Sequence, residues 1–184
     1  GEKKNDVDKF EESYLGYIDC NTTRAGYPES KRLGESLCNA YAVQKGQEFI
    51  IGRFSRVYGP TMAVDDSKAI AQFIRKAVAG EDIILKSEGN QLYSYTYVVD
   101  AATAALYVLL YGENGSAINI ADRDSDIALK DLAGYLAKEA GMKVIFELPD
   151  QVEKAGYSTA TKALLDSTKI EQLGWKAKTG IADG

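Results

Sequence analysis

Short apolar runs alternate with helical patterns along almost the whole chain of 184 residues, and this alternation constrains the fold more than any other feature. Strand-like runs lie at residues 48–54, 83–85, 93–98, 117–120 and 143–147. Helical periodicity marks residues 27–45, 67–79, 101–111, 129–140 and 166–174. Strands that alternate with helices are typical of an α/β fold. Residues 1–26 carry no period, and we expect them to form a loop.

Several segment ends carry recognisable signals. Pro28 suits the first turn of the first helix, and Gly46 suits its end. Ser67 and Asp100 are each expected to cap the helix that follows them. The second of these helices is very apolar and is therefore expected to be buried, as is the strand at 48–54.

Composition excludes several classes of chemistry. The chain has no histidine, which removes Ser-His-Asp and Cys-His catalysis and histidine-ligated zinc. Cys20 and Cys38 match no metal or redox spacing, so we expect two reduced cysteines, no metal site and a cytoplasmic location. The net charge of −5 argues against nucleic acid as a partner. No apolar run reaches the roughly 18 residues of a membrane span.

The pair most suited to catalysis is Tyr27 and Lys31. Positions four apart on a helix lie on one face, so the phenol and the ammonium are expected to be neighbours. A neighbouring cation stabilises phenolate, which lets a tyrosine accept a proton. The alternative is a surface tyrosine and lysine with no role, because the bare spacing is common.

Further stretches put this pair in context. They are Tyr27-Pro28-Glu29-Ser30-Lys31-Arg32 with Glu35, Arg53-Phe54-Ser55-Arg56-Val57-Tyr58-Gly59-Pro60, Tyr97-Val98-Val99-Asp100, Ile118-Asn119-Ile120-Ala121, and Ser167-Thr168-Lys169-Ile170 with Leu173-Gly174-Trp175. In order and spacing they resemble the NAD-dependent epimerase/dehydratase family, the nucleotide-sugar branch of the extended short-chain dehydrogenases/reductases. The resemblance covers nearly the whole chain.

The resemblance implies the C-terminal part of a Rossmann-type doubly wound parallel sheet plus a smaller α/β substrate domain. Residues 1–60 would end the dinucleotide-binding domain. Residues 61–184 would form mainly the substrate-binding domain, with some segments returning to the Rossmann sheet. The family's Gly-rich fingerprint is absent from the sequence, and its catalytic Ser or Thr would fall just before residue 1. We therefore expect a fragment that is inactive in isolation.

By resemblance, the whole protein would be a homodimeric isomerase or lyase that oxidises a sugar hydroxyl of a nucleotide sugar to a transient ketone. Tyr27 would be the base and Lys31 its partner, and both would contact NAD or, alternatively, NADP. Phe54 and Val57 would also contact the cofactor. Epimerisation, dehydration and decarboxylation all stay open. Two rivals also remain, an NADP-dependent carbonyl reductase and a non-catalytic nucleotide-binding protein on the same fold.

Arg56 and Tyr93 are the expected substrate-binding residues, and both depart from the family pattern. Arg56 stands where many members carry Asn, and it either faces the substrate diphosphate or forms a surface salt bridge. Tyr93 stands where members often carry a phosphate-binding Arg. The alternation of Tyr93, Tyr95 and Tyr97 predicts packing rather than a stacking platform.

Three more residues have structural interpretations. Glu11 and Glu12 lie in the polar N-terminal loop and are expected to be solvated. Trp175, the single tryptophan, is expected to make a core or edge contact.

Overall fold

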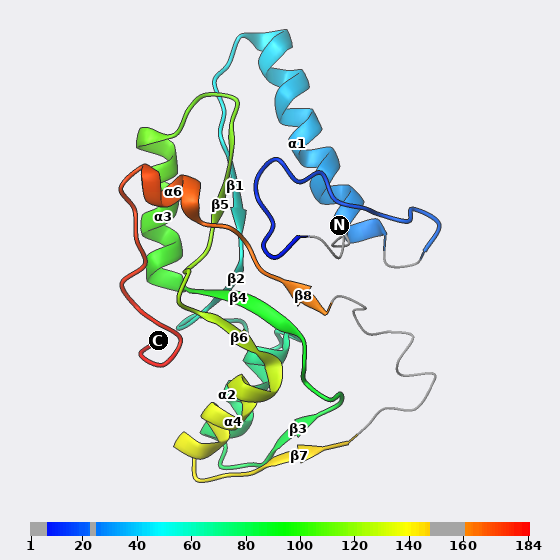
Figure 1. Ribbon diagram of the computed structural model, residues 1–184, viewed down its shortest axis with the longest axis vertical. Helices are drawn as coiled ribbons and strands as arrows, with labels where there is room; N and C mark the ends of the chain where they lie inside the picture. Colours follow the sequence, from blue (N-terminus) through cyan, green and yellow to red (C-terminus); the bar gives the residue numbers. More distant parts are fainter. Residues whose placement is uncertain (1–6, 23–24, 148–160) are drawn as a thin grey trace.

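The computed structural model describes residues 7–22, 25–147 and 161–184, which form an α/β structure with two lobes along its longest axis (Figure 1). The first lobe contains α1 (Gly26–Lys45), β1 (Ile51–Phe54), α3 (Val98–Tyr111), β5 (Ala117–Ile120) and α6 (Thr168–Gln172). The second contains β2 (Arg56–Tyr58), α2 (Ala69–Val78), β3 (Ile83–Leu85), β4 (Leu92–Tyr97), β6 (Asp126–Ala128), α4 (Leu129–Glu139), β7 (Val144–Phe146) and β8 (Lys162–Ala163). The predicted α/β class is confirmed.

The first lobe is built on a parallel pair of strands. β1 and β5 run side by side from the Ile51–Ala117 pair to the Phe54–Ile120 pair. In Figure 1, α1 stands on one side of these strands, and α3 and α6 lie on the other. The inward side of α3 packs with β5 and α6 in a core of Ala104, Val108, Ile118, Ile120, Ile170 and Trp175.

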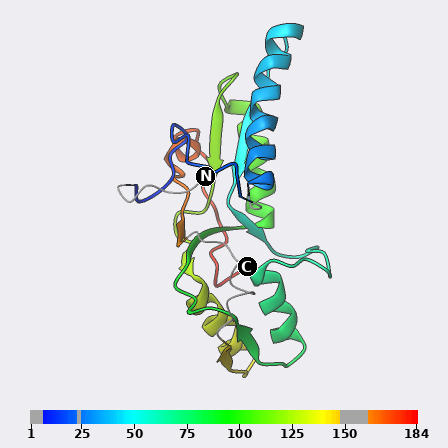
Figure 2. The same cartoon turned by 90° about the vertical axis from the view of Figure 1, so that its right-hand side faces the viewer.

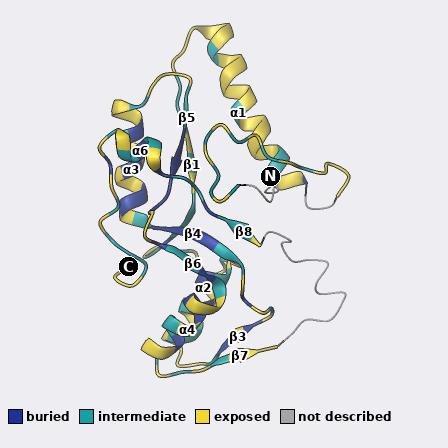
Figure 3. Cartoon of the chain, viewed as in Figure 1, coloured by how far each residue is buried: buried dark blue, intermediate teal, exposed yellow. Residues whose placement is uncertain are grey.

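The opposite surfaces of this lobe are exposed. None of the residues of α1 is buried, and the outward side of α3 presents Leu106, Leu109 and Leu110 to solvent (Figure 3). The expectation of a buried helix at 101–111 is therefore correct for only one face. The strand at 48–54 is shorter than predicted, and its residues alternate between half-buried and exposed.

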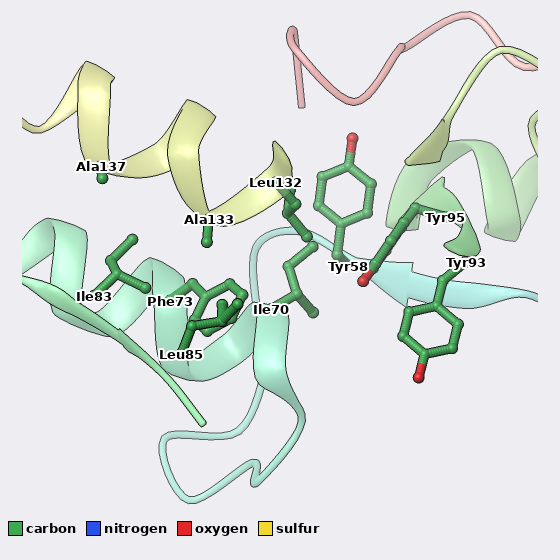
Figure 4. Close-up of a cluster of buried hydrophobic side chains, with 10 residues drawn as sticks. All are labelled: Tyr58, Ile70, Phe73, Ile83, Leu85, Tyr93, Tyr95, Leu132, Ala133 and Ala137. Atoms are coloured by element: carbon green, nitrogen blue, oxygen red, sulfur yellow. The ribbon is translucent and has the colours of Figure 1, made fainter. Parts of the chain in front are cut away.

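The second lobe combines two small sheets with two helices. β4 lies in the middle of one sheet, parallel to β2 and β8 and antiparallel to β6, while β3 pairs with β7 in parallel. Helices α2 and α4 pack against each other through Ile70 and Phe73 on one side and Leu132, Ala133 and Ala137 on the other (Figure 4). The apolar face predicted for α2 is confirmed.

Two predicted helix caps are wrong. Ser67 does not cap α2, because the helix begins at Ala69 and Lys68 is the residue directly before it; the Lys68 N–H donates to Asp66 Oδ1 at 2.9 Å. Asp100 lies inside the first turn of α3, where its Oδ2 accepts the Thr179 N–H at 2.8 Å. The carboxylate therefore attaches the C-terminal segment, which turns back toward the junction of the lobes (Figure 2).

Among the described residues, none of the helices combines the length and the apolar character needed to cross a bilayer. Cys20 and Cys38 are both exposed and unpaired, as the sequence predicts.

Candidate active site

The amino-terminal turn of α1 presents Tyr27 and Lys31 together. Ala25, directly before the helix, is buried and its carbonyl accepts the Glu29 N–H at 2.9 Å, which fixes the start of α1. The Lys31 ammonium lies 5.4 Å from the centroid of the Tyr27 ring. The Tyr27 side chain is 73 % exposed, so its hydroxyl is open to a ligand. The structure thus brings the predicted acid/base pair onto one face.

These two side chains line a hollow of about 540 Å³ between α1, the strands of the first lobe and the N-terminal segment. Arg53 of β1, Asn119 of β5 and Phe10 of the N-terminal segment also line it. A tyrosine with an adjacent ammonium at an open hollow can, as the phenolate, take a proton from a bound hydroxyl group.

Arg53 and Glu35 join β1 to α1 beneath this hollow. The guanidinium donates two parallel hydrogen bonds to the carboxylate, at 2.8 Å and 2.7 Å, and a third to the Glu12 carbonyl at 2.9 Å. The hydrogen bond from Arg53 holds the pKa of Glu35 below its usual value, and the same bond raises the pKa of Arg53. Sequence reasoning did not identify this pair, because 18 residues separate its members.

Glu35→Gln will lower the free energy of unfolding by about 1 kcal/mol at neutral pH. This value lies between the typical contributions of a surface ion pair and of a buried hydrogen bond to a charged group. Because the folded pKa of Glu35 is depressed, its contribution is complete above the unfolded pKa of about 4.3 and is lost as pH falls through the folded pKa. Urea denaturation at neutral and acidic pH checks this, with exposed Glu113→Gln as the control. A loss that stays constant into acid would contradict the assignment.

Asn119 ties the N-terminal segment to the first lobe. It is 1 % exposed; its N–H donates to Glu12 Oε1 at 2.8 Å, and its amide donates to the carbonyls of Phe10 and Asp166. Glu12 is therefore bonded rather than solvated, contrary to the prediction, while Glu11 is exposed as expected. The segment that carries Phe10 is held in place beside the candidate pair.

Arg56 and Tyr93 meet on the second lobe. The guanidinium carbon of Arg56 lies 3.4 Å from the centroid of the Tyr93 ring, which is almost fully buried. Within the described residues Arg56 forms no salt bridge, which leaves the diphosphate interpretation as the prediction. The predicted packing role of the tyrosine stripe is confirmed for Tyr93 and Tyr95, which both belong to the buried cluster of Figure 4.

Two other tyrosines at the junction of the lobes are unsuited to accept a proton. Burial raises the pKa of both Tyr58 and Tyr95 to about 12.

The two further residues predicted to contact the cofactor lie near the end of β1. Phe54 is 46 % exposed at the carboxyl end of β1, and Val57 is half-buried in β2. A cofactor role for Phe54 and Val57 stays a prediction.

Comparison with known proteins was made for both sequence and structure. A family model described as "NAD dependent epimerase/dehydratase family" matches residues 2–121. UDP-glucuronic acid decarboxylase 6 of Arabidopsis thaliana is 30% identical over 177 residues, which cover 94% of this chain and 49% of the relative. The chain spans about half the length of the curated relatives it matches.

Solved structures share the fold. UDP-glucose 4-epimerase of Thermotoga maritima, solved with UDP-glucose, superimposes with a TM-score of 0.84 at 22% identity, covering 100% of this chain and 56% of the other. UDP-glucuronic acid 4-epimerase of Bacillus cereus, solved with UDP-glucuronic acid and NAD, gives 0.81 at 22% identity, with 100% and 55% covered. These similarities confirm the predicted Rossmann-type architecture.

Proposed function

The chain belongs to the NAD-dependent epimerase/dehydratase family, and from this we propose that the whole protein oxidises a hydroxyl of a nucleotide sugar to a transient ketone. Epimerisation, dehydration or decarboxylation of the sugar would follow from that ketone. The observation that carries the proposal is the pairing of Tyr27 with Lys31 at an open hollow of about 540 Å³. Relatives named as UDP-glucuronic acid decarboxylases support the nucleotide-sugar class.

Tyr27 acts as the general base in this proposal. Its exposed side chain acts as the phenolate, whose oxygen takes the proton of the sugar hydroxyl and becomes the neutral phenol, and the nearby ammonium of Lys31 favours the phenolate form. Bound NAD supplies the two-electron acceptor for the oxidation. Lys31, an ammonium with three donors at the same hollow, suits the ribose hydroxyls of such a cofactor. Exposed Phe54, at the end of β1, and half-buried Val57 of β2 would also contact it.

The proposal is tested by incubating the whole protein and NAD with UDP-glucose, UDP-glucuronic acid and dTDP-glucose, and by identifying products by NMR. We expect one substrate to be converted without net consumption of cofactor, because the hydride taken up by NAD is returned to the ketone or to the product that forms from it. In a parallel incubation with NADPH in place of NAD, stoichiometric consumption of NADPH without sugar isomerisation or elimination would contradict the proposal and indicate a reductase.

The 184-residue chain by itself is expected to bind NAD too weakly to measure at about 1 mM ligand. Dinucleotide pyrophosphates are held by a Gly-rich turn at a helix N-terminus, and the sequence contains no such fingerprint after a strand. Calorimetric titration of this chain with NAD checks the expectation, with the whole protein as the positive control. Saturable binding at micromolar NAD would contradict it.

A homodimer is also part of the proposal, and α1 supports it. Leu33, Leu37 and Tyr41 form one stripe along this helix, and each is more than half exposed. Leu37→Glu in the whole protein is expected to shift the dimer towards monomer in light scattering. Val43→Glu, at an exposed position on another face of α1, is the control. Equal dimerisation of both variants would contradict a dimer interface on this stripe.

The unpaired cysteines support a cytoplasmic location, which is also part of the proposal.

A further inference from the structure

Arg56 occupies the junction between the two lobes. It begins β2, which a single residue separates from the end of β1, and it lies in register with Tyr95 of β4. The intervening Ser55 donates its N–H to the Ile120 carbonyl at 2.9 Å, which prolongs the parallel pairing of β1 and β5. Ligands of open α/β sheets bind outside the carboxyl ends of the strands. Arg56 therefore stands at the edge of the sheet where a ligand is expected.

The position of the Arg56 guanidinium is fixed by Tyr93. The cation lies 3.4 Å from the ring centroid, and the ring is 7 % exposed. Tyr93 pairs with Ile127 of β6 and with Ala163 of β8, so neighbouring strands hold its backbone from both edges of β4. Stacking on an aromatic face uses the flat side of a guanidinium and leaves its N–H donors free at the edge.

Arg56 differs from the other half-buried arginine of the described chain. Arg53 is bonded twice to the Glu35 carboxylate. Within residues 7–22, 25–147 and 161–184, Arg56 is half-buried and forms neither a salt bridge nor a side-chain hydrogen bond. Holding a partly desolvated cation in one orientation without a counter-charge is unfavourable unless an anion binds it.

We propose that Arg56, held in place by Tyr93, is the anion anchor of the substrate site. Its free N–H edge binds two oxygens of a phosphate or carboxylate group, and the buried Tyr93 is a positioning residue that does not itself contact the substrate. This inference rests on the proposed function for the identity of the substrate. It changes the expected role of Tyr93 from substrate contact to support for the arginine.

The test is titration of the whole protein with UDP, pyrophosphate and glucuronate as probes. Arg56→Gln is expected to raise the Kd of the bound anion at least tenfold, and Arg56→Lys is expected not to restore it, because an ammonium cannot bond two oxygens in the same geometry. Tyr93→Phe keeps the ring, so its Kd for the anion is expected to stay within threefold of the wild-type value. Tyr93→Leu removes the ring and is expected to raise that Kd as much as Arg56→Gln does.

The probes separate the source of the anion. If Arg56→Gln weakens the binding of UDP and pyrophosphate alone, the arginine binds the diphosphate. If it weakens the binding of glucuronate alone, the arginine binds a sugar carboxylate. Either result supports the anchor. In turnover, Arg56→Gln is expected to raise KM with kcat within about threefold, the pattern of uniform binding. Arg123→Gln, which removes an exposed cation paired with Glu171, is the charge-matched control.

Failure of this inference is distinguishable from failure of the proposed function. If the wild type converts a nucleotide sugar but Arg56→Gln binds every probe as tightly as the wild type does, the anchor is overturned and the function stands. If no nucleotide sugar is converted but Arg56→Gln still weakens an anion tenfold, the anchor stands without that function. A wild type that binds none of the three probes also overturns the anchor.

Discussion

Replacing Tyr27 by phenylalanine in the whole protein is expected to lower kcat by about 10²–10⁴-fold, the range that general acid–base groups contribute. The substitution removes the phenolic oxygen that, in its ionised form, would take the proton of the sugar hydroxyl. It keeps the ring over which Lys31 lies, with 5.4 Å between the ammonium and the ring centroid. Because the Tyr27 side chain is 73 % exposed, we expect the stability and the Kd of the nucleotide sugar to change little.

Steady-state kinetics with the substrate identified by NMR measure this effect, and circular dichroism verifies the fold. Tyr111→Phe is the matched control, because Tyr111 is 59 % exposed on α3 and does not line the hollow. We expect it to keep wild-type activity. A Tyr27→Phe protein that retains more than about a tenth of the wild-type kcat would show that another group takes the proton.

The largest expected effect on stability belongs to Trp175. Trp175→Ala is expected to lower the free energy of unfolding by about 3–5 kcal/mol, as for other large buried aromatics. The indole is 3 % exposed and packs with Val108 of α3 and Ile170 of α6. Its Nε1 also donates to Thr103 Oγ1 at 3.2 Å. The substitution would leave a cavity at the point where α6 is held to α3.

Chemical denaturation of the 184-residue chain or of the whole protein measures the loss. Trp175→Phe keeps much of the packing but not the hydrogen bond, so a smaller loss is expected. Leu109→Ala removes a side chain that is 73 % exposed and should change stability by less than about 0.5 kcal/mol. If Trp175→Ala cost no more than Leu109→Ala, this tryptophan would not be the core contact that its burial indicates.

Long periodic segments were predictable from the sequence, because their signals are local. α4 agrees with the predicted helix at 129–140, and Gly46 ends α1 in the left-handed conformation with φ 65°. By contrast, β2, β6 and β8 have two or three residues each and were not predicted. Strands this short show too few positions for a period of two to be recognised.

Long-range bonds explain the remaining errors. Aspartate is a common helix cap, but the carboxylate of Asp100 accepts a hydrogen bond from the N–H of Thr179, 79 residues further along the chain. Glu12 likewise belongs to a polar segment, yet it accepts the N–H of Asn119. The helical period of α1 showed that it is a helix without showing that none of its residues would be buried. Tertiary partners decide these features, and a local pattern does not contain them.

The candidate site was only partly predictable. The spacing of Tyr27 and Lys31 was sufficient to place them on one face, because a helix repeats about every 3.6 residues. The stacking of Arg56 on Tyr93 depends on the pairing of β2 with β4, and β2 was not anticipated. The sequence pattern indicated each residue as a candidate for substrate binding. Only the structure shows that the two are in contact, and the positioning role of the ring depends on this contact.

The most direct test of Tyr27 as the base is a single-turnover experiment on the whole protein with NAD bound. Rapid mixing with the nucleotide sugar, followed by the absorbance of reduced nicotinamide, isolates the oxidation step from product release. We predict a transient signal in the wild type and in Tyr111→Phe, and a rate of its appearance at least about 10²-fold lower in Tyr27→Phe. Appearance of the signal at the wild-type rate in Tyr27→Phe would contradict the account.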